Sequence, residues 1–286
     1  MRLASFETGD HRTYGLVDGN ALREAGKDFR ARYPDLRAAL TAGTLGELAA
    51  SASGPAIDTN RVRFLPLIPN PDKVICVGVN YRPHIEEMGR KVPEFPVVFV
   101  RFPGSQIGHG EALIRPGLSD QFDYEGELAF VIGKRARHVS RADALDYVAG
   151  YTCFMDGSVR DWQNHTPQFT AGKNFASSGS MGPWLVSSDE VPDPAVLTLT
   201  TRLNGEIMQQ GRVADLVFDI PRLIEYCSSF TELLPGDVIA TGTPGGVGAA
   251  RTPPRWLQAG DRVEVDIPGV GLLANSVADE RAGLAP

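Results

Sequence analysis

The sequence has little of three features that mark particular protein classes. It contains only three cysteines in 286 residues, Cys76, Cys153 and Cys227, each within an apolar run. Free buried thiols are therefore expected, and neither a disulfide framework nor a zinc cluster is. No apolar run has the length of a membrane span, and the N-terminus lacks the apolar core of a signal peptide. These absences predict a cytoplasmic protein with no membrane partner.

Positive charge is also scarce. The chain has 28 Lys and Arg against 35 Asp and Glu, which gives a formal net charge of −7. An acidic surface without basic runs does not favour binding to nucleic acid or to anionic lipid. Because 42% of the residues are hydrophobic and 22% are charged, the composition is that of an ordinary globular protein. We therefore expect a small-molecule substrate and no nucleic-acid partner.

Turn and linker signals divide the chain into a small N-terminal unit, residues 1–70, and a larger unit, residues 71–286. The run Ser51–Pro55 is a linker by composition, and prolines at 66, 69 and 71 follow it. Within the first unit, the pattern predicts strands near Arg2–Phe6 and Thr13–Val17 and helices near Leu36–Leu40 and Leu45–Ala50. No chemistry is expected from this unit.

The larger unit is predicted to be rich in strands. Helix starts are recognised only at Ser140–Asp143, leading to Tyr147, and at Asp219 with Pro221. Asn204-Gly205 indicates a tight hairpin. The runs with strand character are Val74–Val79, Val97–Arg101, Glu127–Ile132, Gly150–Met155, Leu197–Leu203, Val238–Thr241, Arg262–Ile267 and Leu272–Val277. This pattern predicts a β-rich α+β fold with a rolled or sandwich-like sheet.

Three carboxylates suggest a site for a metal ion. Glu125 and Glu127 flank Gly126 at the start of an apolar strand, so both side chains point to the same face, and Asp156 ends another such run. Three oxygen ligands without a His or Cys cluster suit Mg²⁺ or Mn²⁺ better than Zn²⁺. The alternative is that Glu125 and Glu127 lie on the solvated face of an edge strand.

Two further motifs could carry chemistry. His84 and Glu87 share one face of a helical turn, where a carboxylate can orient the imidazole of a general base, although a surface pair is the alternative. The run Thr241–Gly248 is rich in glycine, but no Gly-Lys-Ser/Thr follows it, as a nucleotide loop requires. It is either a plain turn or a loop whose amides, with Thr241 and Thr243, contact a substrate carboxylate.

Taken together, these motifs resemble the fumarylacetoacetate hydrolase family over roughly Val74 to Val277. The elements that carry the resemblance are Asn80-Tyr81-Arg82-Pro83-His84, Asp123-Tyr124-Glu125-Gly126-Glu127-Leu128, Asp156 to Gln163, Gly172-Lys173-Asn174-Phe175, and Thr241 to Gly248. The resemblance implies that family's rolled mixed β-sheet, after a small N-terminal α+β domain, and a homodimer. Pro83 and Arg101 depart from it, since they stand where Asp and Lys are common.

The resemblance also implies roles for individual residues. Glu125, Glu127 and Asp156 are expected to hold Mg²⁺ or Mn²⁺, with Ca²⁺ as a further option, and His84, Glu87 and Lys173 are the expected catalytic residues. The residues expected to bind substrate are Tyr81, Arg82, Arg101, Gln163, Thr241 and Thr243. Trp162 and Phe169 are expected in the core.

The reaction expected from these residues is hydrolysis of a C–C bond in an acylpyruvate, through a pyruvate enolate that the cation stabilises. In this hypothesis His84, oriented by Glu87, deprotonates the attacking water. The alternatives within the same chemistry are an oxaloacetate-type decarboxylase and an unsaturated keto-diacid isomerase, neither of which needs that water. A catalytically inactive ligand-binding protein of the same fold is the alternative outside enzymes.

Overall fold

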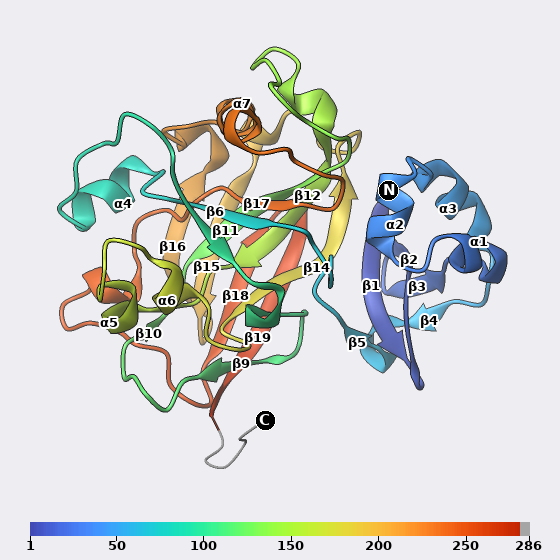
Figure 1. Ribbon diagram of the computed structural model, residues 1–286. Helices are drawn as coiled ribbons and strands as arrows, with labels where there is room; N and C mark the ends of the chain where they lie inside the picture. The colour runs from blue at the N-terminus through green and yellow to red at the C-terminus, as the bar shows by residue number, and fades with distance from the viewer. Residues whose placement is uncertain (281–286) are drawn as a thin grey trace.

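A large mixed β-sheet organises the molecule (Figure 1). The structure is a computed structural model, and residues 1–280 are described here. Most neighbouring strands are antiparallel, but β17 pairs in parallel with β6. In spatial order the main path of this sheet is β4 (Ile57–Asp58), β3 (Ala21–Glu24), β2 (His11–Asp18), β1 (Arg2–Thr8), β14 (Gly179–Ser187), β12 (Val148–Met155), β11 (Gly126–Ile132), β17 (Val238–Ala240), β6 (Val74–Gly78) and β7 (Val97–Arg101).

The remaining strands of the chain lie beside or against this sheet. β5 (Arg63–Phe64) pairs with β1, and β8 (Gln106–Ile107) pairs with β14. β10 (Phe122–Asp123) and β13 (Ser158–Val159) form a separate pair. A five-stranded sheet has the order β16 (Glu206–Arg212), β15 (Thr198–Leu203), β18 (Arg262–Ile267), β19 (Gly271–Asp279) and β9 (Ala112–Arg115).

Helices are short and lie outside the two main sheets. The N-terminal part contains α1 (Lys27–Arg32), α2 (Leu36–Thr41) and α3 (Leu45–Ser51). The rest of the chain contains α4 (Arg82–Glu87), α5 (Arg160–Gln163), α6 (Thr170–Lys173) and α7 (Ile220–Phe230). Asp219 caps α7 by accepting a hydrogen bond from the Arg222 amide at 2.9 Å. Along the described part of the chain, no helix has the combined length and apolar character that crossing a bilayer requires.

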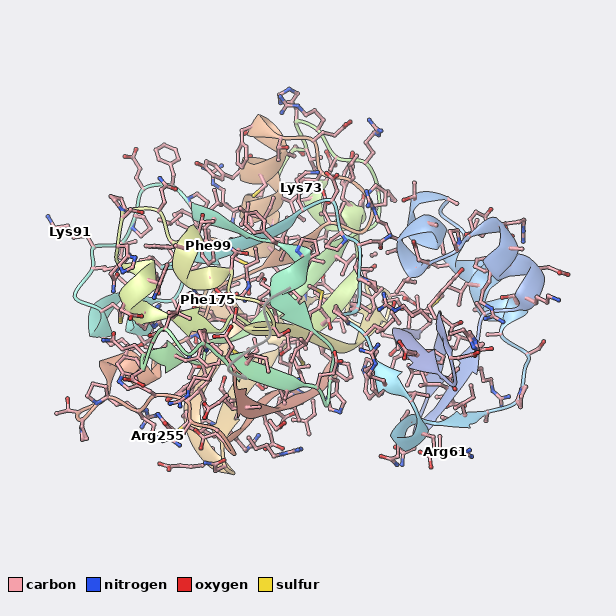
Figure 2. All side chains as sticks on the ribbon, turned by 60° about the horizontal axis from the view of Figure 1, so that its bottom comes forward. Arg61, Lys73, Lys91, Phe99, Phe175 and Arg255 are labelled. Carbon is pink, nitrogen blue, oxygen red and sulfur yellow. The ribbon has the colours of Figure 1, made fainter. Side chains whose placement is uncertain are left out.

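The N-terminal part continues the large sheet. Strand β1 pairs with β14 through Leu3 and Leu185, so the first strands extend the sheet on the right of Figure 1. Figure 2 shows Arg61, in this part, at the opposite end of the molecule from Lys91, which follows α4. The N-terminal helices therefore lie far from α4.

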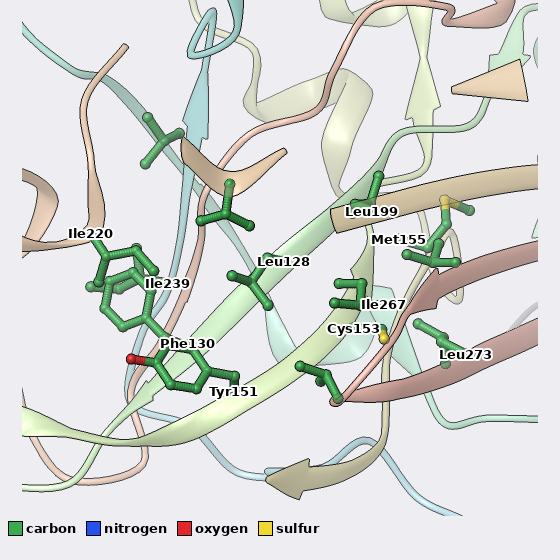
Figure 3. Packing of buried hydrophobic residues seen from close by; sticks show 14 of the residues in the cluster. Leu128, Phe130, Tyr151, Cys153, Met155, Leu199, Ile220, Ile239, Ile267 and Leu273 are labelled. Atoms are coloured by element: carbon green, nitrogen blue, oxygen red, sulfur yellow. The ribbon is translucent and has the colours of Figure 1, made fainter. Parts of the chain in front are cut away.

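The main core lies between the large sheet and the five-stranded sheet (Figure 3). Leu128 and Cys153 from the large sheet face Leu199 and Leu273 from the smaller one. At Gly126 the two sheets approach closely, because a Cβ there would lie 2.0 Å from the Thr201 Oγ1 atom. The sequence at the start of β11 thus needs glycine between its two glutamates.

The structure confirms the predicted fold class and most of the predicted strands. Strand β14 was not among the predicted strands, although its nine residues lie between β1 and β12. Gly182 and Pro183 interrupt its apolar pattern, and its register with β12 shifts there. The prediction of a helix from Ser140 to Tyr147 is wrong, because only a 3₁₀ turn over Ala144–Tyr147 forms. All three cysteines are buried free thiols, as predicted.

Candidate metal centre

The antiparallel pairing of β11 with β12 brings the three predicted carboxylates together. Gly126 pairs with Met155, so Glu125 and Glu127 at the start of β11 lie beside Asp156 at the end of β12. The Asp156 amide donates to the Glu125 carbonyl at 2.8 Å, which fixes this register. One carboxylate oxygen from each of the three residues lies within 4.8 Å of the others. All three side chains are buried, so the solvated-edge alternative is excluded.

Two of these carboxylates have cationic partners from the same chain. The Lys173 ammonium group donates to Glu125 Oε2 at 2.6 Å and to Asp156 Oδ2 at 2.7 Å. Arg160 Nη2 lies 2.7 Å from Glu125 Oε1. Burial would raise the pKa of Glu125, but Arg160 and Lys173 outweigh that effect and hold the pKa below its usual range. Glu125 is therefore ionised in the folded protein.

Glu127 is in a different position, because within residues 1–280 it forms no ion pair with Lys, Arg or His. It accepts one hydrogen bond, from the Gly242 amide at 2.8 Å. Burial, together with the negative charges of Asp156 and Glu125, raises the pKa of Glu127 well above its usual value. A divalent cation among the three oxygens would remove this repulsion, so the donor set fits a hard, oxygen-seeking ion.

The predicted His84–Glu87 pair forms on α4. The His84 Nδ1 atom lies 2.8 Å from Glu87 Oε1, and Glu87 Oε2 accepts a hydrogen bond from the Gly246 amide at 2.8 Å. Gly246 has a φ of 104°, and a Cβ there would lie 2.1 Å from the Met208 carbonyl oxygen, so this loop position favours glycine. The glycine-rich loop thus holds Glu87, which in turn orients the imidazole.

His84 and the three carboxylates line the same pocket, which is partly open to solvent. Glu87 contacts His84 but does not itself line the pocket. Among the other residues expected to act on substrate, Lys173, Gln163 and Thr243 also line this pocket. Phe169 also lines the pocket, at 5.7 Å between ring centroids from Phe99. Its prediction as a core residue holds in part, because the partly buried ring packs against a hydrophobic cluster.

The structure does not bring the other four expected substrate contacts to the pocket lining. Tyr81 and Thr241 are buried elsewhere, and Arg82, at the start of α4, is exposed to solvent. Arg101 lies behind the site with no exposed side-chain surface, where it donates to Asp156 Oδ1 and, at 2.9 Å, to the Gly157 carbonyl. Its contacts are those of a group that positions Asp156.

Two residues of the quoted motifs have contacts that the sequence did not indicate. Arg160 donates to Asp123 Oδ2 and to Gln163 Oε1, each at 2.9 Å. Asp123 also accepts from the Gly248 amide at 2.8 Å and from the Ala249 amide at 3.0 Å. Asp123 therefore ties the glycine-rich loop to the metal-site residues. The five-residue motif Asp156-Gly157-Ser158-Val159-Arg160 was the available signal, but it did not identify the partner.

Comparison with protein families gives a match over most of the chain. Residues 73–278 match the family model described as "Fumarylacetoacetate (FAA) hydrolase C-terminal". The chain belongs to the fumarylacetoacetate hydrolase family. The match contains the acidic triad and the His84–Glu87 pair, and it leaves out most of the N-terminal part.

Named relatives of the chain within the fumarylacetoacetate hydrolase family include two tautomerases. The chain is 39% identical over 264 residues to "Oxaloacetate tautomerase Fahd2a, mitochondrial" of Rattus norvegicus, which covers 92% of this chain and 84% of that protein. It is 44% identical over 214 residues to "Oxaloacetate tautomerase YisK" of Bacillus subtilis, which covers 73% of this chain and 71% of that protein.

A solved structure of the fumarylacetoacetate hydrolase family also matches. It is the maleylpyruvate hydrolase from Sphingobium sp. SYK-6 in complex with manganese (II) ion and pyruvate. The TM-score is 0.80 at 30% identity, over 98% of this chain and 100% of that one. The present chain is therefore a member of a family of metal-binding enzymes.

Proposed function

We propose that this protein interconverts the keto and enol forms of a 2-oxo dicarboxylic acid of the oxaloacetate type, with a divalent cation bound by Glu125, Glu127 and Asp156. The observation that supports this best is that His84, which is paired with Glu87, and the acidic triad line one pocket. The two tautomerases at 39% and 44% identity support the same substrate class.

In this proposal His84 moves the proton. Glu87 accepts a hydrogen bond from Nδ1–H, so Nε2 of the neutral imidazole is free to accept a proton. When the keto form reacts, a proton leaves C3 for Nε2, the electron pair becomes the C2=C3 bond, and the 2-oxo oxygen gains a proton. The keto and enol forms are isomers, so the acid gains and loses no atoms overall. A divalent cation in the acidic triad supplies Lewis-acid stabilisation of the negative charge that develops on the acid.

The remaining pocket residues bind and orient the acid. Lys173 brings a positive charge next to the triad, and Gln163 and Thr243 offer hydrogen-bonding groups in the lining. Tautomerisation needs no water as a reactant, so these side chains are needed only to hold the acid against His84. The same arrangement would allow loss of CO₂ from the acid. The test must therefore distinguish decarboxylation from tautomerisation.

Hydrolysis of an acylpyruvate is the second candidate. The family relationship to the maleylpyruvate hydrolase, at 30% identity, favours it. In that reaction His84 deprotonates a water that attacks the distal carbonyl carbon, and the products are pyruvate and a carboxylic acid. The three reactions differ in their products, so they can be distinguished directly.

The test is to incubate the Mn²⁺-loaded protein with oxaloacetate in D₂O. We expect deuterium to enter at C3, measured by NMR, much faster than release of CO₂, and we expect no acid product from a panel of acylpyruvates. Fast hydrolysis of an acylpyruvate without C3 exchange would support the second candidate instead. Rapid CO₂ release would indicate a decarboxylase.

Two variants test the residue roles. His84→Ala should slow C3 exchange by about 10²- to 10⁴-fold, as loss of a general base does. Glu127→Gln should lower the Mn²⁺ content measured by elemental analysis. His11→Ala is the matched control, because His11 pairs with Glu24 at 2.7 Å in an exposed position on β2. If His84→Ala exchanges as fast as the His11→Ala control, the role of His84 is wrong.

A further inference from the structure

One cationic side chain in the pocket lining is not paired with the carboxylates of the acidic triad. Lys173 and Arg160 are paired with the carboxylates at the base of the pocket. Arg90 also lines the pocket, but within residues 1–280 its guanidinium group forms neither a hydrogen bond nor an ion pair. This residue is exposed, whereas Lys173 is only 2% exposed. Arg90 therefore lies at the mouth of the pocket.

The backbone of Arg90 is fixed relative to His84. The Gly89 amide donates to the Glu86 carbonyl at 3.0 Å, and the Arg90 amide donates to the Ile85 carbonyl at 2.9 Å. These two bonds form a Schellman motif at the end of α4, with Gly89 at its left-handed position, where φ is 61°. The helix that carries the proton-transfer residue thus also sets the position of Arg90.

Aromatic rings connect Arg90 to the base of the pocket. The guanidinium carbon lies 5.2 Å from the centre of the Phe169 ring. Phe169 contacts Phe99 edge to face, and the Lys173 ammonium group lies 5.0 Å from the Phe99 ring centre. The two rings form an apolar wall with a cation near each end. A ligand with a negative charge at both ends and a short carbon chain between them matches this wall.

We infer that Arg90 binds the distal carboxylate of the substrate and selects dicarboxylic 2-oxo acids over monocarboxylic ones. This inference rests on the proposed function, which places the 2-oxo acid end at the triad. The distal carboxylate is then the one substrate charge without a partner, and a planar guanidinium group pairs with carboxylates in a bidentate geometry. Arg82 and Lys91, the other basic residues around α4, are exposed and do not line the pocket.

The experiment compares oxaloacetate with 2-oxobutanoate, in which a methyl group replaces the distal carboxylate. For Arg90→Met, we expect KM for C3 exchange of oxaloacetate to rise about 10- to 100-fold, because a charge-assisted ion pair is lost. Exchange of 2-oxobutanoate should stay within about twofold of the wild-type value, since methionine keeps the apolar contact with Phe169. Arg90→Lys should recover part of the loss.

Lys91→Met is the matched control, because Lys91 is the adjacent cation and points away from the molecule in Figure 2. Lys91→Met should leave the C3 exchange of both acids unchanged. Oxalate, which has no distal group, should inhibit Arg90→Met as strongly as the wild type. An equal loss on both substrates, or no loss on either, would overturn the role of Arg90.

If the wild-type protein catalyses C3 exchange of neither acid, the proposed function is wrong. The binding role of Arg90 is then tested separately. Calorimetry then decides that role. The Mn²⁺-loaded protein should bind oxaloacetate at least about 10-fold more tightly than 2-oxobutanoate. Arg90→Met should abolish this difference, and equal affinities in the wild type would overturn the inference.

Discussion

Lys173 links two of the three carboxylates of the acidic triad. Its ammonium group is 2% exposed and bridges Glu125 and Asp156. In the metal-free protein, Lys173→Met should lower the free energy of unfolding by about 3 to 5 kcal/mol, because removing one partner leaves buried charge without compensation. Added Mn²⁺ should restore more stability to the variant than to the wild type, measured as the shift in melting temperature.

Lys73→Met provides the comparison for this prediction. Lys73 forms an ion pair with the buried Asp237 at 3.0 Å, outside the metal site. The control should lose stability without any additional gain from Mn²⁺. Equal Mn²⁺-dependent shifts in Lys173→Met and in the wild type would mean that Lys173 and the cation do not act on the same carboxylates.

At the residue scale, the sequence predicted local relationships and failed on distant ones. Glu125 and Glu127 were recognised because alternation along one strand requires no knowledge of the fold, and His84 with Glu87 because three residues make nearly one helical turn. One partner of Asp123, the Gly248 amide, lies 125 residues away. Arg101 was placed with the substrate contacts because its charge suits an anion, whereas the structure surrounds it with buried acceptors such as Asp156. No local pattern distinguishes these two environments.

At the scale of elements, Asp261 joins three segments around β18. It accepts hydrogen bonds from Arg255 at 2.8 and 2.9 Å, from Asn204 in the hairpin turn at 2.8 Å and from the Gln258 amide at 2.8 Å. Burial would raise the pKa of Asp261, but the hydrogen bonds from Arg255 and Asn204 outweigh it, and the pKa is lowered. We expect Asp261→Asn to lose about 1 to 3 kcal/mol of stability at pH 7.

The lowered pKa fixes how this loss depends on pH. A carboxylate with a lowered folded-state pKa stabilises the protein fully above the unfolded-state pKa of about 3.9, and this stabilisation disappears as the pH falls through the folded-state value. The difference in melting temperature between the wild type and Asp261→Asn should therefore shrink between pH 7 and pH 3. A difference that stays constant would contradict the pairing. Asp266→Asn is the control, since Asp266 forms one partly exposed ion pair with Arg202 at 3.1 Å and should cost at most about 1 kcal/mol.

Prediction of the elements succeeded where the hydrophobic pattern was uninterrupted. The apolar run of β11 identified that strand, because all seven of its residues are buried. Strand β14 was missed since Gly182 and Pro183 interrupt its apolar pattern, yet pairing of Gly182 with Cys153 of β12 keeps the strand extended there. The Ser140 region shows the opposite error, because its capping residues have a helical pattern but only a 3₁₀ turn over Ala144–Tyr147 follows them.

At the scale of the whole molecule, the N-terminal part extends the large sheet and shares a hydrophobic cluster with the larger unit. Leu3, Phe29 and Leu36 belong to the same buried cluster as Phe99 and Leu185 of the larger unit. The predicted division at residue 70 stays a prediction, since a shared sheet and a shared cluster do not show whether residues 71–286 fold independently. The cluster does mean that the two parts stabilise each other.

Truncation tests this coupling. A chain that begins at Pro71 would lose the strand that pairs with β14 and uncover Leu185, which is fully buried in the complete chain. Because uncovering apolar surface costs about 25 cal/mol per Å², we expect a melting temperature at least about 10 °C lower and increased binding of a hydrophobic dye.

The full chain should unfold in one transition by circular dichroism and by tryptophan fluorescence. Leu3→Ala should lower the free energy of unfolding by about 2 to 5 kcal/mol, since Leu3 lies at the junction of the two parts. The variant should still unfold in a single transition. The full chain could instead unfold in two separate transitions, with the truncated chain as stable as the part that unfolds second. That result would show that the larger unit does not depend on the N-terminal part.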